Sequence, residues 1–162
     1  MKTLANPRDQ QELLERLSGV RPDSPRGWGK MTATQMVCHL NDSFTTKLGG
    51  KPVRSRANLF TRTVVKWAAL WAPVPWPHGF KTPPELDQQI GGTPPSDFEG
   101  DRARLISLMK QFGEEIGGKK IGGKEINAHP SARHPFFGAM TTREWLRWAY
   151  LHVDHHLRQF GC

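Results

Sequence analysis

Three of the seven histidines in this 162-residue chain lie close together near its C-terminal end, at His152, His155 and His156. Imidazole nitrogens bind divalent metals, and two residues four apart on a helix lie on the same face. Advancing about 100° per residue places His152 and His156 beside the apolar stripe of a C-terminal helix, next to Trp145. The same step leaves His155 nearly opposite the stripe, near the surface. The spacing therefore favours His152 and His156 as a metal-binding pair.

A metal site that performs chemistry generally takes three protein ligands and keeps one position open. His39, in the middle of a predicted helix, is the best candidate for the third, although it lies off the centre of that helix's apolar face, with Gln35 near it. His134 precedes the last helix and could approach the pocket to support a ligand or contact a substrate. Unrelated histidines at the border of a core would give the same pattern, so the spacing alone leaves both interpretations open.

Capping residues and apolar periodicity predict the helices that must position these side chains. In order, they begin after Asn6, at the capping box 32–35, near Ala57, after Ser96 or Asp97, and at the capping box 141–144. We find no strand-like alternation and no internal repeat. The prediction is one all-α domain over residues 1–162, a four-helix bundle with long connections rich in proline and glycine.

The periodicity also predicts which side chains are buried. On the last helix, we expect Arg143, Arg147, Asp154 and Arg158 to face solvent. Trp67 and Trp71 lie four apart in the helix predicted over residues 57–72, and core packing is the simpler interpretation of that spacing. The alternative, which includes Trp76 in the following turn, is a cover over the metal pocket or a dimer contact.

The charge is basic and unevenly distributed. The chain has 23 Lys and Arg against 15 Asp and Glu, a formal charge of +8, and it has no acidic residue between Asp42 and Glu85. A solvated basic surface is the simplest explanation. The alternative is an anionic small ligand, for which Arg54, Arg56 and Arg62 are candidate contacts because guanidinium binds carboxylates through two hydrogen bonds. No helix-turn-helix, zinc-finger or RNA-recognition signature supports a nucleic-acid partner.

The remaining composition bounds the class of protein. Two cysteines, Cys38 and Cys162, exclude a disulfide scaffold or a cysteine-rich zinc module. The N-terminus has no apolar signal segment, and no window contains the roughly 18 apolar residues that a membrane helix requires. We therefore expect a soluble cytoplasmic protein with no membrane partner.

Two regions of the chain resemble a known superfamily. Residues 28–40, from Trp28 to Leu40, resemble the second-helix signature of the DinB/YfiT-like metalloenzymes. Residues 134–138, Trp145 and residues 152–159 resemble the same branch, which is catalogued as a domain of unknown function. The resemblance implies a four-helix bundle with one divalent metal held by His39, His152 and His156, zinc or nickel in the isolated protein. His155 departs from the family pattern.

The resemblance also carries expectations about activity. Characterised members include thiol-dependent S-transferases and a thiol-dependent isomerase, which hold a low-molecular-weight thiol on the metal as thiolate. The implied function is a thiol-dependent S-transferase or a metal-dependent hydrolase acting on a small anionic or electrophilic substrate, in a homodimer. Two alternatives remain open: a non-catalytic bundle that acts as a binding or stress-response module, and a basic protein associated with nucleic acid.

Overall fold

The computed structural model describes residues 1–48, 50–117, 120–121, 124–125 and 133–162, and these are mainly helical, as predicted. The helices are α1 (Pro7–Ser18), α2 (Ala33–Lys47), α3 (Lys66–Trp71), α4 (Phe98–Gly117) and α5 (Thr142–Gln159), with a π-helical turn η1 (Thr61–Val65) and a 3-10 turn η2 (Pro84–Leu86). Two antiparallel strands of two residues each, β1 (Lys120–Ile121) and β2 (Lys124–Glu125), were not predicted. No helix in these described residues combines the length and apolar character needed to cross a bilayer.

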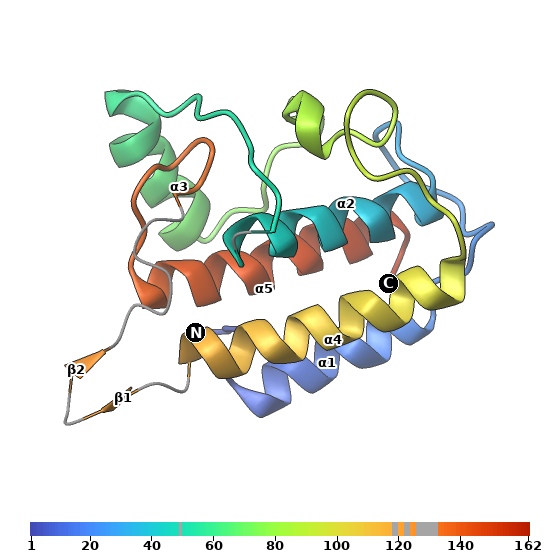
Figure 1. Cartoon of the computed structure of the whole chain (residues 1–162), viewed down its shortest axis with the longest axis horizontal. Helices are drawn as coiled ribbons and strands as arrows, with labels where there is room; N and C mark the ends of the chain where they lie inside the picture. The colour runs from blue at the N-terminus through green and yellow to red at the C-terminus, as the bar shows by residue number, and fades with distance from the viewer. Residues whose placement is uncertain (49, 118–119, 122–123, 126–132) are drawn as a thin grey trace.

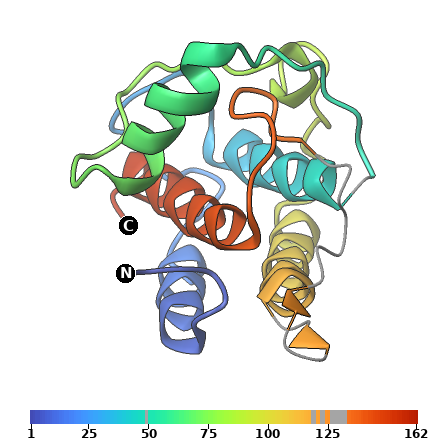
Figure 2. The same ribbon diagram turned by 90° about the vertical axis from the view of Figure 1, so that its left-hand side faces the viewer.

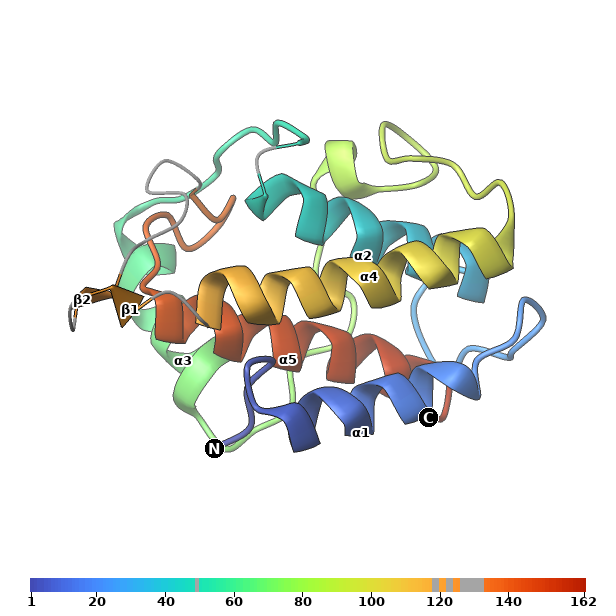
Figure 3. The ribbon, with the colours of Figure 1, turned by 60° about the horizontal axis from the view of Figure 1, so that its bottom comes forward.

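The four long helices, α1, α2, α4 and α5, lie alongside one another (Figure 1). Helix α2 packs on α4, and α5 contacts all three of the others (Figure 3). Figure 2 shows these four helices around a common core, with α3 on the outside against α5. Each long helix contributes to that core a set of fully buried apolar side chains, which includes Leu13, Leu17, Met36, Leu40, Phe44, Leu105, Met109, Phe112, Val153 and Leu157.

Side-chain caps fix where these helices begin, at the predicted positions. The side chain of Asn6 accepts hydrogen bonds from the first turn of α1. Both predicted capping boxes are present, at the starts of α2 and α5. Of the two residues considered for α4, Asp97 forms the cap, since its carboxylate accepts the N–H of Gly100. Such caps satisfy N–H groups that have no partner within the helix.

The segment predicted as one buried helix over residues 57–72 differs from that prediction. It winds through the π-helical turn η1 into the short helix α3, and Leu70 is fully buried there. Trp67 is 62% exposed, so the core packing expected for it is wrong. Helical spacing shows which side chains share a face, but not whether another element covers that face.

The solvent-facing side predicted for α5 is also partly wrong. Asp154 is buried and accepts a hydrogen bond from Arg16 of α1 at 2.7 Å, while Arg158 pairs with its other carboxylate oxygen at 3.0 Å. Because α1 packs against this side of α5, the carboxylate lies at a helix contact and not in water.

Candidate metal centre

Three histidines from two helices converge in the interior. Nε2 of His39, on α2, lies 3.2 Å from Nε2 of His152, on α5. The ring centroid of His156, one turn further along α5, lies 4.8 Å from that of His39 and 4.9 Å from that of His152. Each residue offers a ring nitrogen within 4.8 Å of the other two, and all three side chains are buried. The structure therefore brings together the three predicted ligands.

Hydrogen bonds fix the orientation of two of these rings. Nδ1 of His39 donates to the carbonyl oxygen of Leu86 at 2.9 Å, and Nδ1 of His156 donates to Oε1 of Gln159 at 3.1 Å. The amide nitrogen of Gln159 donates in turn to the carbonyl oxygen of Trp28, which sets the orientation of the amide. Because these oxygens can only accept, the rings carry their protons on Nδ1 and keep lone pairs on Nε2.

Burial keeps the three imidazoles neutral. It lowers the pKa of His39 and brings the pKa values of His152 and His156 well below that of free imidazole. The neighbouring histidines lower the pKa values of His152 and His156 further, because a second positive ring would be repelled. Neutral imidazole is the form that binds a metal ion, so the site does not have to lose protons at pH 7.

The donor set fits a divalent transition metal. Two nitrogens bound to one tetrahedral zinc ion at about 2.0–2.1 Å lie roughly 3.3 Å apart, close to the distance between His39 and His152. Imidazole suits zinc, nickel, copper and iron, whereas magnesium and calcium prefer oxygen. Nδ1 of His152 is buried and has no hydrogen-bond partner among the described residues, so this ring is the least constrained of the three.

Aromatic rings surround the three histidines. The ring of Trp148 lies 4.8 Å from that of His152, and the ring of Trp76 lies 6.0 Å from it. Trp76 is therefore one of the tryptophans that adjoin the site, as the alternative interpretation of this residue proposed. Trp28 stacks on His78 at 4.0 Å, which brings the loops that carry them together near α5.

His155 does not belong to the group of three. Its ring lies 5.7 Å from that of Trp76 and 5.9 Å from that of Trp28. These tryptophans leave His155 half-buried, whereas the sequence placed it near the surface. The face assignment was correct in separating His155 from His152 and His156, but helical periodicity could not show that loops would cover it.

His134 and Trp145, the weaker candidates, lie one layer away from the three histidines. Nδ1 of His134 accepts the backbone N–H groups of Phe136 and Phe137, and burial lowers the pKa of its ring to about 3. The ring of Trp148 lies between, 5.2 Å from that of His134 and 4.8 Å from that of His152. Trp145 packs against Trp148 at 5.3 Å. Both residues therefore pack against Trp148, which in turn contacts His152.

Gln35 and the three arginines are placed elsewhere. The side-chain oxygen of Gln35 accepts the N–H of Thr32 in the capping box. The backbone N–H of Arg54 donates to the carboxylate of Glu85, and that of Arg56 donates to the carbonyl oxygen of Pro135. The side chain of Arg62 lies against Gly138. Within the described part of the chain, no hydrogen bond joins any of these four side chains to the three histidines.

Sequence reasoning missed the groups that orient the ligands. Gln159 follows His156 by three residues on the same helix, a spacing that brings side chains together and could have indicated the contact. The carbonyl group of Leu86 gives no signal in the sequence, because any residue carries one. Its position depends on how η2 packs against α2.

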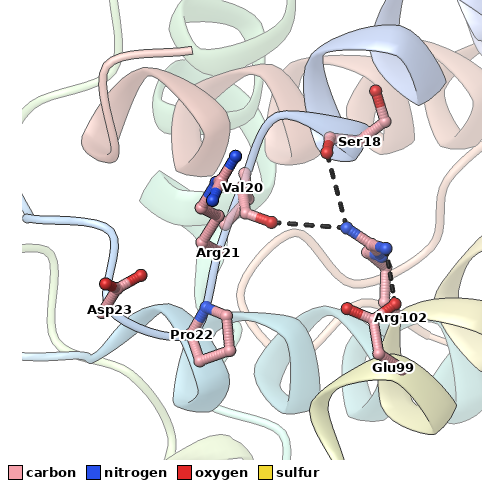
Figure 4. A pocket seen from close by; sticks show the side chains of 7 residues that line it. All are labelled: Ser18, Val20, Arg21, Pro22, Asp23, Glu99 and Arg102. Carbon is pink, nitrogen blue, oxygen red and sulfur yellow. Dashed lines mark hydrogen bonds and ion pairs between the residues drawn. The ribbon is translucent and has the colours of Figure 1, made fainter.

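A separate hollow lies at the C-terminal end of α1, where that helix approaches the start of α4 (Figure 4). Its volume is about 430 Å³, and it is lined by Ser18, Val20, Arg21, Pro22, Asp23, Glu99 and Arg102. Arg102 already donates to two backbone carbonyls and pairs with Glu99. None of the lining residues is a histidine, and the guanidinium of Arg102 is satisfied by the protein itself.

Comparison with known proteins gives one match. The model of a family described as "Protein of unknown function (DUF1569)" matches residues 8–161, a span that includes His39, His152 and His156. No curated protein and no solved structure matches the chain. The expected branch is thereby confirmed as a domain family of unknown function, while membership of the DinB-like superfamily stays a prediction. The chain belongs to the DUF1569 family.

Proposed function

We propose that this protein is a metal-dependent enzyme with a DinB-like four-helix bundle, and that His39, His152 and His156 hold one divalent ion. The observation that supports this proposal is the convergence of three buried, neutral imidazoles, two of which have their Nδ1 protons held by oxygen acceptors. Such an arrangement directs lone pairs toward one point, as a metal centre requires.

The side chains around the proposed centre favour an anionic ligand. The group of three contains no carboxylate, and imidazole is neutral, so the protein ligands leave the charge of a divalent ion uncompensated. A bound divalent cation would supply a position at which a thiol is held as thiolate, or at which a water has a pKa near 7.

The residues of the chain then have separable tasks. Leu86 and Gln159 hold the imidazoles of His39 and His156 in the ligating tautomer. Trp76 and Trp148 lie against His152 and give the site apolar walls that exclude bulk water. This combination supports transfer of a small electrophilic group to a low-molecular-weight thiol, or hydrolysis of a small substrate at the same centre.

Turnover by metal-loaded protein tests the proposal. Purified protein loaded with zinc or nickel is incubated with a panel of low-molecular-weight thiols and a small electrophile, and the disappearance of free thiol is followed. We expect metal-dependent consumption that His39→Ala abolishes and Gln35→Ala retains, because the contact of Gln35 among the described residues is in a helix cap. Metal-dependent loss of an ester substrate without thiol would identify the hydrolase. Metal binding without either reaction would contradict an enzymatic role.

A further inference from the structure

The outer side of the segment that contains η1 and α3 carries large apolar side chains in water. Leu59, Phe60, Val64 and Trp67 are 79%, 62%, 54% and 62% exposed. Phe80, in the loop that follows α3, is 60% exposed. Four of these five side chains fall between residues 59 and 67 of one helical segment, and exposed apolar groups that lie together usually mark an interaction site. In Figure 2 the helical part of this segment lies outside the four long helices.

Contacts with the loop before α5 place Phe80, Arg56 and Arg62 beside that loop. The ring of Phe80 lies 5.0 Å from that of Phe136, and the backbone N–H of Arg56 donates to the carbonyl oxygen of Pro135 at 2.8 Å. Arg62 packs so closely on Gly138 that a Cβ there would lie 3.1 Å from Nε of the arginine. We call this region the basic apolar face, and it comprises Leu59, Phe60, Val64, Trp67 and Phe80 with Arg54, Arg56, Arg62, Lys81 and Arg133.

The basic apolar face carries a net positive charge. Its five cations are exposed and form no ion pair within the described residues. Glu85 accepts the backbone N–H of Arg54, and its carboxylate partly offsets the charges of Arg54 and Arg56. Glu144 pairs with Lys66 at 2.9 Å. The segment between Asp42 and Glu85 contains no other acid. The complementary surface is therefore both anionic and able to take up apolar side chains.

We propose that the basic apolar face binds the surface of an anionic lipid membrane. Tryptophan, phenylalanine and leucine would enter the boundary between headgroups and acyl chains, and the arginines and the lysine would meet lipid phosphates. The absence of a spanning segment led to the prediction of no membrane partner, but binding at the interface needs no span. This proposal is independent of the metal centre, because the face contains none of the three histidines.

Two other occupants fit the face less well. A second copy of the chain would bring a second set of the same cations to the contact, and like charges opposed across an interface disfavour it. A nucleic acid would pair with the cations but would leave Leu59 and Val64 without an apolar partner. A lipid surface satisfies both kinds of side chain at once.

Vesicle sedimentation tests the proposal with the full chain. The protein is mixed with vesicles of phosphatidylcholine alone, or of phosphatidylcholine with phosphatidylglycerol, at low and high salt. We expect binding to the anionic vesicles that salt weakens. Trp67→Ser should lower the partition coefficient about tenfold, since an aromatic anchor is lost. Lys81→Gln should lower it about fivefold, as expected for one basic residue near an anionic surface.

Matched variants outside the face serve as controls. Ile90 is 72% exposed and apolar, and Arg8 is an exposed cation, so Ile90→Ser and Arg8→Gln should bind vesicles like the unmodified chain. All four positions are exposed, and circular dichroism would verify that each variant is folded. Absence of binding to anionic vesicles, or equal loss in the controls, would overturn the proposal. So would a dimer seen by light scattering that Trp67→Ser dissociates, because the occupant would then be a second copy.

Discussion

Nε2 of His39 and Nε2 of His152 lie 3.2 Å apart although the two residues are separated by 113 positions in the sequence. Helices α2 and α5 hold them, and each of these helices starts at a capping box. Two unprotonated ring nitrogens repel at this distance unless a proton or a metal ion lies between them. The packed interior therefore requires a proton or a metal ion between these two nitrogens.

Gln159 should contribute to metal affinity without being a ligand. Its amide oxygen holds Nδ1 of His156, and loss of such an outer contact typically weakens metal binding about 10–100-fold. Gln159→Leu should therefore bind zinc more weakly by that factor in competition with a chromophoric chelator. Gln35→Ala, which removes a glutamine from a helix cap, should leave the affinity unchanged. Equal affinities for Gln159→Leu and the unmodified chain would show that the contact does not orient the ligand.

Asp42 should be a major contributor to stability. This buried carboxylate accepts hydrogen bonds from Lys51, from the side chain of Gln88, and from both the backbone N–H and the hydroxyl of Thr93. Asp42→Ala leaves these donors unpaired and should lower the free energy of unfolding by about 2–4 kcal/mol in urea titrations. Asp23→Ala, at an exposed position, should change it by less than about 0.5 kcal/mol. Similar values for both variants would refute the assignment.

The stability of the metal-free protein should fall as the pH drops below about 6.5. Burial lowers the pKa of His134 to about 3, so the unfolded chain binds the proton first and acid favours unfolding. Each such histidine adds a slope of about 1.4 kcal/mol per pH unit below the unfolded pKa. His39, His152 and His156 act in the same direction, because burial lowers their pKa values too.

His134→Asn isolates one of these contributions. The asparagine oxygen can accept the same backbone N–H groups, of Phe136 and Phe137, but cannot take up a proton. Urea titrations between pH 7.5 and 5, with chelator present, should give the same pH dependence as the unmodified chain above about pH 7, and below about pH 6 a slope shallower by about 1.4 kcal/mol per pH unit. An unchanged slope would mean that His134 titrates equally in the folded and unfolded states.

Local chemistry made the helix starts predictable. Thr32 with Gln35 and Thr141 with Glu144 satisfy helix N–H groups through contacts within four residues, which a sequence displays directly. The periodicity of α5 likewise separated His155 from His152 and His156. These features depend only on the helix that contains them.

Contacts between elements were not predictable in the same way. Asp154 was assigned to solvent, because periodicity does not reveal that α1 packs against that side of α5 and supplies Arg16. Trp67 was assigned to the core for the corresponding reason, because helical spacing does not reveal that its side chain stays exposed among the described residues. The carbonyl oxygen of Leu86 is a partner of His39 because η2 packs against α2, and the identity of a residue does not indicate where its backbone carbonyl will lie.

Metal content tests the central proposal most directly. Protein purified without a histidine tag is loaded with zinc or nickel, freed of unbound metal and measured by elemental analysis. We predict one ion per chain, a loss to background in His39→Ala, His152→Ala and His156→Ala, and full content in His155→Ala, which changes an adjacent histidine outside the group. Full metal content in His39→Ala and His156→Ala, or loss in His155→Ala with retention in His152→Ala, would contradict the proposed centre.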